Sequence, residues 1–316
     1  MTSQSIEAVN VSKRYGTFSA ISNLNLKIEG AKCVGFLGPN GAGKTTTLKI
    51  LTDMIRPTEG KAYINGISIH ENKRQALAHV GDLIESPEIY PSFTPKEALS
   101  MVADLRGVPR SEKRNRIEEA ITEVKMEEWK DKKVGKFSKG MKQRVNIAAA
   151  LLSEPDIILL DEPTSGLDPR GMSEVRDIVK SLKKKNRLVF MSSHLLPEVA
   201  DVCDEVAMID HGKLLVYDTL ENVTSKFSGD SSAVVEVGFS RTSDDSSSME
   251  NISAIPGVVS VQRIDSRNHR IRFSGGSTGQ EQLLSNLASM KMGLVSFRTP
   301  SSALEDTYLN LIKDAQ

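Results

Sequence analysis

One octapeptide constrains the fold of this chain more than any other feature. Residues 38–45 read Gly-Pro-Asn-Gly-Ala-Gly-Lys-Thr and directly follow the apolar run at residues 33–37. A buried strand, a glycine-rich turn and a helix start, in that order, form the phosphate-binding loop of the Gly-x-x-x-x-Gly-Lys-Thr type. Because fixed Gly, Lys and Thr at these spacings rarely arise by chance behind such a strand, we interpret the segment as a nucleotide site rather than a plain connecting turn.

Each residue type in this loop suits phosphate binding. Gly38, Gly41 and Gly43 allow backbone N–H groups to approach the phosphates where a Cβ would collide. The helix that begins near Lys44 points its positive dipole end at the same anion. Lys44 is long enough to reach the β- and γ-phosphates of ATP, and the Thr45 hydroxyl can ligate the bridging Mg²⁺. The other loop residues predicted to contact the nucleotide are Pro39, Asn40, Ala42 and Thr46.

Composition limits the remaining possibilities. A chain of 316 residues exceeds the usual size of one domain, so we expect a core domain and a smaller second one. Its 41 Lys and Arg residues balance 41 Asp and Glu residues, so the net charge does not indicate a nucleic-acid binder steered by a basic surface, and only local basic patches are left for such a role. The basic run at residues 183–185 is interpreted as a solvated helix end.

Cysteine usage and hydropathy indicate the cellular compartment in which the chain folds. Cys33 and Cys203 lie in apolar segments without metal-ligand spacing, so we expect buried thiols and no disulfide. The first residues lack the basic start and apolar stretch of a secretory signal, and no window approaches the roughly 18 apolar residues that span a bilayer. The sequence therefore predicts a cytoplasmic chain.

Strand and helix signals alternate along most of the chain. Residues 8–13 and 24–28 read as an antiparallel strand pair ahead of the phosphate-loop strand, and residues 62–66 as a further short strand and turn. Residues 96–152 are charged and helix-rich. Strands at 157–160, 188–191 and 206–209 then alternate with helices at 170–184 and from residue 195. This alternation predicts a parallel α/β sheet.

A second motif ends the strand at residues 157–160. Four apolar residues, typical of a central parallel strand, are followed by Asp161 and Glu162. At this end of the strand Asp161 can hold Mg²⁺ through water, and Glu162 can orient and deprotonate an attacking water. Alone, the two acids could equally be solvated groups that cap a strand. Together with the phosphate loop they indicate a P-loop hydrolase.

A third motif precedes this strand. Residues 137–144 read Phe-Ser-Lys-Gly-Met-Lys-Gln-Arg before the apolar helix at 145–152. Ser138 is a suitable N-cap and Gly140 permits close backbone approach, so the helix start is a second potential anion site. Taken by itself, an ordinary capped helix is the better interpretation.

In series, these motifs resemble those of the ATP-binding-cassette (ABC) ATPase family. The phosphate loop, Ser-x-Gly-x-x-Gln-Arg, Leu-Leu-Asp-Glu-Pro-Thr, Ser-Gly-Leu-Asp and Ser-His occur in family order over about residues 5–225. In that family two cassettes close head to tail, and each ATP lies between the phosphate loop of one and the signature helix of the other. The resemblance implies that Ser138 and Gly140 contact the γ-phosphate across the dimer, that Asp168 contacts the dimer interface, that His194 hydrogen-bonds the γ-phosphate, and that Tyr15 stacks on adenine.

The chain departs from the family pattern at three positions. Lys139 and Met141 replace the Gly and Gln of the common Leu-Ser-Gly-Gly-Gln signature. Glu85 stands where most cassettes have a glutamine that senses Mg²⁺, and its carboxylate can bind the metal while adding negative charge beside Asp161 and Glu162. Glu85-Ser-Pro and Tyr90-Pro91 resemble the cassettes of bacitracin-resistance and lantibiotic-immunity exporters.

The resemblance implies a transport function. Such cassettes lack membrane spans and dock on separate permease subunits, through a groove between the main sheet and the helical region after Glu85. We therefore expect an ATP-hydrolysing subunit that forms a homodimer or paired cassette around two ATP at the inner face of the cell membrane, and drives export of a drug, peptide antibiotic or lipid-like substrate. The alternative class, soluble cassette ATPases acting on ribosomes or DNA, typically carries two cassettes or a long coiled-coil insert, and this chain shows neither.

The predicted fold is a P-loop NTPase cassette of the α/β class, with an antiparallel β subdomain, a helical insert and a small C-terminal α+β domain. We place the cassette at residues 1–227, its helical subdomain at about 86–152, a linker at 228–232 and the accessory domain at 233–316. In the accessory domain we expect strands near 234–237, 258–264, 271–273 and 294–297, helices at 280–290 and 302–313, and a solvated loop at 241–251. Residues 300–308 resemble the C-terminal end of drug- and antibiotic-export cassettes. This domain shows no catalytic constellation, and we interpret it as dimer support or regulation.

Overall fold

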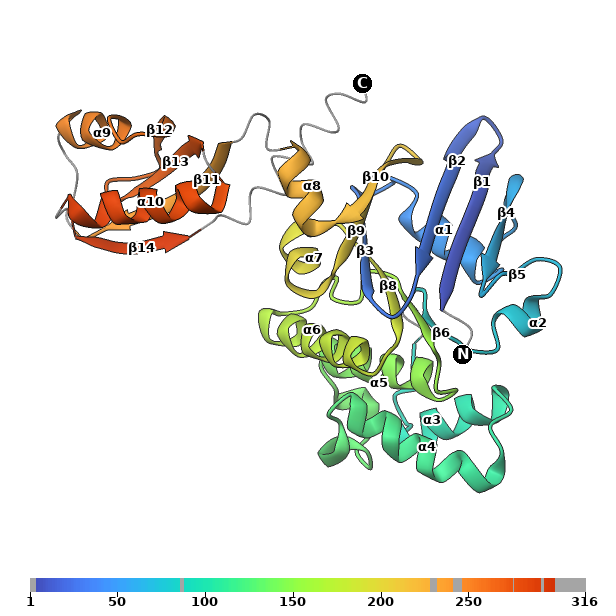
Figure 1. The fold of residues 1–316 in the computed structure, drawn as a ribbon. Helices are drawn as coiled ribbons and strands as arrows, with labels where there is room; N and C mark the ends of the chain where they lie inside the picture. The colour runs from blue at the N-terminus through green and yellow to red at the C-terminus, as the bar shows by residue number, and fades with distance from the viewer. Residues whose placement is uncertain are drawn as a thin grey trace. The chain divides into compact units, whose positions relative to one another are not determined.

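The computed structural model describes residues 4–85, 88–227, 232–240, 246–274, 276–290 and 293–298. The chain divides into two compact units, Met1–Leu220 and Glu221–Gln316. We call them the N-terminal unit and the C-terminal unit, and each is described by itself (Figure 1). In the described residues, no helix is both long enough and apolar enough to cross a bilayer.

A six-stranded sheet forms the centre of the N-terminal unit. Its strand order is β10-β9-β3-β8-β7-β6, parallel throughout except for the antiparallel edge pair β9 and β10. The strands are β3 (Cys33–Leu37), β6 (Val80–Leu83), β7 (Ile157–Leu160), β8 (Leu188–Ser193), β9 (Glu205–Asp210) and β10 (Lys213–Thr219). Every residue of β3, β7 and β8 is buried, as expected for parallel strands covered on both faces.

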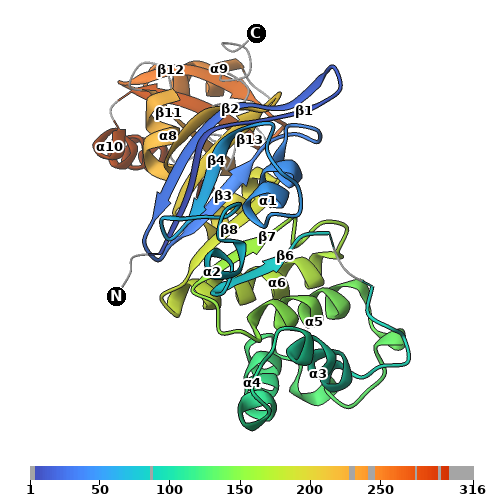
Figure 2. The ribbon, with the colours of Figure 1, turned by 90° about the vertical axis from the view of Figure 1, so that its right-hand side faces the viewer.

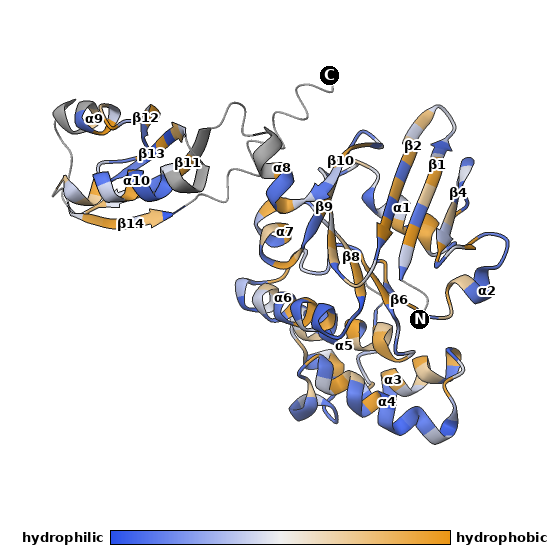
Figure 3. Ribbon diagram, in the orientation of Figure 1, coloured by the Kyte–Doolittle hydropathy of each residue, from blue (hydrophilic) through white to orange (hydrophobic). Residues whose placement is uncertain are grey.

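A second sheet covers one face of the first. It has the order β2-β1-β4-β5 and is antiparallel, with strands β1 (Ser5–Tyr15), β2 (Phe18–Glu29), β4 (Glu59–Ile64) and β5 (Ile67–Ser68). Hydrophobic and hydrophilic residues alternate along β1 and β2, as expected when one face of each strand is buried (Figure 3). Helix α1 (Lys44–Leu51) lies between the sheets, where Leu48 and Leu51 join Ile21, Ile64 and Phe190 in one core.

Helices cover the other face of the parallel sheet and extend away from it (Figure 2). They are α5 (Lys139–Leu151), α6 (Pro169–Lys184) and α7 (Leu196–Val202), with α3 (Pro95–Leu105), α4 (Arg110–Glu123) and the short 3₁₀ turns η1 (Glu127–Trp129) and η2 (Val134–Lys136) beyond α5; the four-residue α2 (Lys73–Ala76) precedes β6. Helix α3 begins with a capping box, in which Thr94 and Glu97 each accept from the other's backbone N–H, and with Pro95 at its first turn. The strand pair, the parallel α/β sheet and the helical insert are thus confirmed.

Ionic contacts join the end of α4 to the start of β8. Arg187 donates to Glu123 at 2.8 Å, and Lys185 also donates to this carboxylate. Burial by itself would raise the pKa of Glu123, but the hydrogen bonds from Arg187 and Lys185 prevail and hold that pKa below its ordinary value. The helical region is therefore fixed to the parallel sheet by three charged side chains at this point.

The C-terminal unit alternates β, α, β, β, α, β. After the connecting helix α8 (Leu220–Phe227) come β11 (Ser232–Phe239), α9 (Ser246–Ser253), β12 (Val258–Arg263), β13 (Asn268–Ser274), α10 (Gly276–Ser289) and β14 (Leu294–Arg298). The sheet is antiparallel with order β12-β13-β11-β14, which is the ferredoxin-like arrangement. Both helices pack on one face of it, since Ile252 of α9 and Leu283 of α10 share a core with Val235, Ile271 and Phe273.

One prediction in this unit is wrong. Residues 246–251, expected within a solvated loop, belong to helix α9. Their composition is polar, but Ile252 and Ile255 are buried against the sheet, and this packing outweighs the weak helix propensity of the serines. The predicted helix at 302–313 and linker positions 228–231 lie outside the described residues, whereas Ser232 is the first residue of β11.

The two cysteines are free and buried, as predicted. Their sulfur atoms lie 3.6 Å apart, one on β3 and the other just after α7. The hydrogen bond between the two thiols, together with burial, raises the pKa of the Cys203 thiol. The two side chains pack as apolar volume between the helix and the sheet.

Candidate functional site

The phosphate loop joins β3 to α1 at the carboxyl end of the parallel sheet. Gly43 adopts φ +107°, and a Cβ there would lie 2.7 Å from the backbone oxygen of Ala20. A Cβ on Gly38 would lie 2.4 Å from the backbone oxygen of Ile209. Backbone atoms cannot give way to a side chain at either distance, so this loop geometry requires glycine at both positions.

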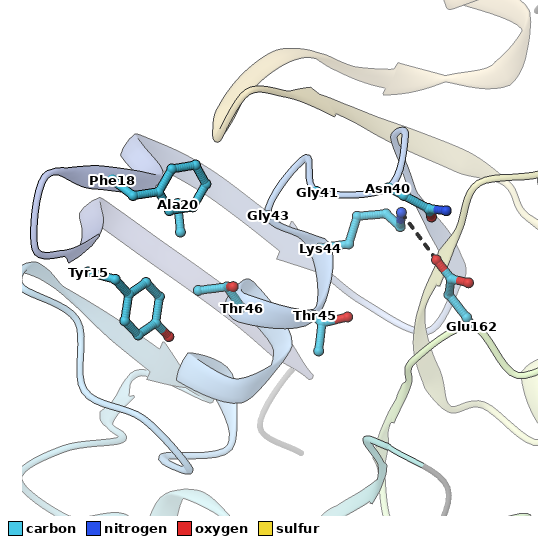
Figure 4. Close-up of a pocket in the computed structure, with 10 residues that line it drawn as sticks. All are labelled: Tyr15, Phe18, Ala20, Asn40, Gly41, Gly43, Lys44, Thr45, Thr46 and Glu162. Atoms are coloured by element: carbon cyan, nitrogen blue, oxygen red, sulfur yellow. Dashed lines mark ion pairs between the residues drawn. The ribbon is translucent and has the colours of Figure 1, made fainter.

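A pocket of about 240 Å³ opens beside this loop. Figure 4 shows Tyr15 and Phe18 at one end of it and Asn40, Lys44 and Glu162 at the other. The two aromatic residues pair across the β1–β2 hairpin, and both rings are largely exposed. The lining is completed by Ala20, Gly41, Gly43, Thr45 and Thr46. The pocket is therefore aromatic at one end and rich in phosphate-binding groups at the other.

Lys44 is the buried cation of this pocket, with a side chain only 4% exposed. Its ammonium donates to the backbone oxygens of Gly38 at 2.8 Å and Pro39 at 3.0 Å. It also lies 3.2 Å from a carboxylate oxygen of Glu162. The loop's own carbonyls thus aim the lysine at the acidic end of β7.

Four side chains gather where β7 and β8 end. The Ser192 hydroxyl donates to Asp161 at 2.6 Å and accepts from the backbone N–H of Glu162 at 2.9 Å. Nδ1 of His194 lies 3.0 Å from the Glu162 carboxylate. Glu162 has φ +42°, a conformation that costs a non-glycine residue roughly 1–3 kcal/mol and is concentrated at functional sites. The predicted catalytic residues Glu162 and His194 are therefore in direct contact.

A magnesium ion fits the oxygen ligands beside this pocket. Thr45 lines the pocket, and the Asp161 carboxylate is oriented by Ser192 at the end of the adjacent strand. In the described part of the chain, no three acidic, histidine or cysteine side chains cluster as a metal cage. Mg²⁺ typically binds through one or two protein oxygens together with phosphates and waters, so this sparse ligand set suits it.

The third predicted metal ligand, Glu85, has a different partner. Its carboxylate lies 2.5 Å from the ammonium of Lys49 on α1. Glu85 follows β6 and has φ +56°. The structure thus places this glutamate against the phosphate-loop helix.

Ser138, Gly140 and Asp168 lie apart from the pocket lining, at the starts of α5 and α6. Ser138 caps α5 by accepting from the Met141 N–H at 3.2 Å, and Asp168 caps α6 by accepting from the Gly171 N–H at 3.3 Å. The two helix starts are close, since a Cβ on Gly140 would lie 3.2 Å from the Cα of Gly171. Two positive helix ends therefore lie side by side.

Known proteins identify this arrangement. A family model described as "ABC transporter" matches residues 21–165. The bacitracin transport ATP-binding protein BcrA of Bacillus licheniformis is 42% identical over 66% of this chain and 68% of its own length. The chain belongs to the ABC transporter ATP-binding proteins. Like other members of this family, it is an ATP-hydrolysing, ATP-binding subunit.

Further relatives of this ABC subunit extend the comparison. The lantibiotic transport protein SrtF of Streptococcus pyogenes is 36% identical over 69% of this chain and 93% of its own length. The linearmycin resistance protein LnrL of Bacillus subtilis (strain 168) is 26% identical over 97% of both chains, which includes the C-terminal unit. Among solved structures, the ATP-binding cassette MJ0796, a dimer in a post-hydrolysis state with ADP and Pi, has a TM-score of 0.60 and 26% identity, and covers 68% of this chain and 98% of its own.

Sequence reasoning missed several residues of this ABC site. Phe18 lines the aromatic end, and its only sequence signal is its position across the Gly-Thr turn from Tyr15. Ser192 and Lys49 contact the predicted acids but belong to none of the sequence motifs. Gln143 of the signature segment is buried and donates to the Pro163 oxygen at 2.9 Å, which joins the start of α5 to the loop after β7.

Proposed function

We propose that this subunit forms a head-to-tail dimer around two Mg-ATP and drives a separate permease that exports a peptide antibiotic or a lipid-like compound. We infer the dimer because one chain contains two half-sites that are separated from each other. One is the pocket that joins Tyr15 to Lys44 and Glu162, and the other is the paired helix starts capped by Ser138 and Asp168. The cargo class is supported by relatives named for bacitracin and lantibiotic transport and for linearmycin resistance.

Each end of the pocket has a distinct role in this proposal. Tyr15 and Phe18 stack on adenine, while the loop N–H groups and Lys44 hold the phosphates. Lys44 exchanges its contacts with Glu162 and the loop carbonyls for phosphate oxygens when ATP enters. Bound Mg²⁺, held by Thr45 and Asp161, would offset the charge that develops on the phosphates.

Hydrolysis then depends on Glu162. Once Lys44 turns to the phosphates, one oxygen of this carboxylate becomes free to accept a proton from the attacking water. The other oxygen remains beside His194, which fixes the orientation of the carboxylate. The Ser192 hydroxyl bonds both the backbone N–H of Glu162 and the side chain of Asp161, so it links the positions of the two acids.

The second half-site contacts the γ-phosphate of the partner's ATP. Backbone N–H groups at the start of α5, next to Ser138 and Gly140, supply hydrogen-bond donors and a positive dipole end. Asp168 contacts the opposite subunit. ATP is thereby bound more tightly in the closed dimer than in the open one, and this difference in affinity drives the permease.

A separate apolar cavity is the proposed docking site for the permease. The subunit then lies peripherally on the cytoplasmic face of the membrane. The cavity has a volume of about 110 Å³ and lies between the segment after Glu85, α3 and α5. Tyr90 and Met101 line it and are exposed at its rim. Its walls are mainly apolar, which suits a short helical loop of a permease.

The test uses the Glu162→Gln variant, which should bind ATP but fail to hydrolyse it. We expect light scattering to show a dimer with Mg-ATP. From tagged protein crosslinked in native cells, we expect mass spectrometry to identify a multispanning membrane protein. A monomer with Mg-ATP would contradict the sandwich, and recovery of ribosomal or DNA-bound proteins alone would contradict the transporter partnership.

A matched variant separates docking from dimerisation. Glu162→Gln combined with Met101→Glu should still dimerise with Mg-ATP, because Met101 lies outside the nucleotide pocket. It should lose the membrane protein, because a carboxylate in an apolar cavity disfavours an apolar partner. Unchanged recovery of the membrane protein would place the permease contact elsewhere.

A further inference from the structure

Three acidic residues follow the carboxyl ends of two adjacent strands. Glu85 follows β6, and Asp161 and Glu162 follow β7. The strands pair in parallel with Leu83 beside Leu160, and the Asp161 N–H donates to the Leu83 oxygen at 2.8 Å. All three acids therefore follow the same edge of the sheet, next to the loop that binds the triphosphate of ATP. Their negative charges oppose nucleotide binding unless cations offset them.

Helix α1 supplies two such cations. Lys44 lies 3.2 Å from Glu162, and Lys49 lies 2.5 Å from Glu85. Lys49 follows the predicted metal ligand Thr45 by four residues, so both project from one face of the helix. The phosphate-loop helix thus pairs Lys44 with the proposed catalytic acid, and it pairs Lys49 with Glu85, which stands where most cassettes have a glutamine.

We propose that Lys49 is a positioning residue for Glu85: it holds this carboxylate against α1 and offsets its charge toward the bound nucleotide. This inference rests on the proposed nucleotide site. The pair is partly open to solvent, with 25% of the Lys49 side chain and 65% of the Glu85 side chain exposed. Its effect is therefore modest and specific to the glutamate, because a neutral glutamine at position 85 would need no cation.

The test is a double-mutant cycle read by ATP binding without metal. Calorimetry with ATP and excess EDTA compares Lys49→Met with the parent, first with Glu85 present and then in a Glu85→Gln background. With Glu85 present, we expect Lys49→Met to weaken ATP binding by about two- to fivefold, the range expected for a partly exposed ion pair. In the Glu85→Gln background, the same substitution should change the affinity by less than about 1.5-fold.

The conservative variant Lys49→Arg should restore the parental affinity, because arginine keeps the charge beside the carboxylate. Circular dichroism and thermal unfolding of every variant check that the fold is intact. A second readout is Mn²⁺ affinity in the presence of ATP, measured by paramagnetic resonance. Lys49→Met should tighten Mn²⁺ binding only when Glu85 is present, since the released carboxylate becomes available to the metal.

Two results would overturn the proposal. An equal loss of ATP affinity in both backgrounds would mean that Lys49 acts on the phosphates directly. No loss in either background would mean that the pair has no bearing on the site. Both results differ from failure of the proposed nucleotide site itself, which would appear as absent ATP binding by the unsubstituted protein.

Discussion

Glu162 shows how much of this site depends on single residues. Its backbone has a positive φ, its N–H donates to Ser192, and its carboxylate contacts both Lys44 and His194. The residues that contact Glu162 are all distant from it in sequence, and together they fix the position of its side chain. The strained backbone together with these contacts supports the catalytic role that we propose for Glu162.

At the opposite end of the pocket, we predict that Phe18 contributes to adenine binding as Tyr15 does. Phe18→Ala and Tyr15→Ala should each weaken ATP binding by about 1–3 kcal/mol, the value of one base–aromatic stack. Titration of a fluorescent ATP analogue measures the loss. Tyr15→Phe is the control and should bind like the parent, because it keeps the ring. Unchanged binding by Phe18→Ala would leave Tyr15 as the adenine platform.

At the scale of elements, the contact between α5 and α6 positions the residues of the proposed second half-site. Gly140 and Gly171 allow the two helix starts to approach backbone to backbone. Lys139 strengthens this region, since its ammonium donates to the Ser165 oxygen at 3.1 Å in the loop that leads to α6. The lysine that departs from the common signature therefore has a structural partner within its own chain.

We predict that Gly140→Val separates these helices. The added side chain meets the Cα of Gly171, and overpacking of this kind costs about 1–3 kcal/mol of the free energy of unfolding. Urea unfolding followed by the fluorescence of Trp129 measures the cost. Lys142→Val, exposed on the same helix, is the matched control and should change stability by less than about 0.5 kcal/mol. Equal effects from the two variants would show that the close approach of the helices is not required.

At the scale of the whole molecule, features encoded in short contiguous segments could be predicted from the sequence, whereas contacts between distant segments could not. The phosphate loop and the strand that precedes Asp161 could be predicted because each is a short, contiguous motif of characteristic residue types. Ser192 could not, because its contact with Asp161 depends on β8 lying beside β7, and a single sequence does not state strand order. Lys49 was missed for the same reason, and α9 because its packing outweighs its polar composition.

The C-terminal unit should lose stability in mild acid. Burial lowers the pKa of His269, and the nearby charge of Arg263 lowers it further. The folded unit therefore resists protonation, whereas the unfolded chain takes up a proton below about pH 6.5. Stability should fall as the pH drops below this value, by at most about 1.4 kcal/mol per pH unit.

Hydrogen exchange of β11 and β13 at pH 7.5 and 5.5, corrected for intrinsic rates, measures this dependence. His269→Phe keeps an aromatic ring beside Phe239, whose ring centroid lies 5.8 Å from that of His269. In this variant, the stability derived from hydrogen exchange should no longer fall between pH 7.5 and pH 5.5. If the stability of the variant still falls with pH, the pH dependence arises from another group.

The strand order of the parallel sheet also bears on synthesis at the ribosome. The phosphate-loop strand β3 lies between β8 and β9, so Val34 pairs with Phe190 on one side and Glu205 on the other. The loop leaves the ribosome early, but its strand has no neighbours until nearly the whole first unit has been made. We therefore expect that a nascent chain truncated before β8 does not hold ATP, although it carries the complete phosphate-loop sequence.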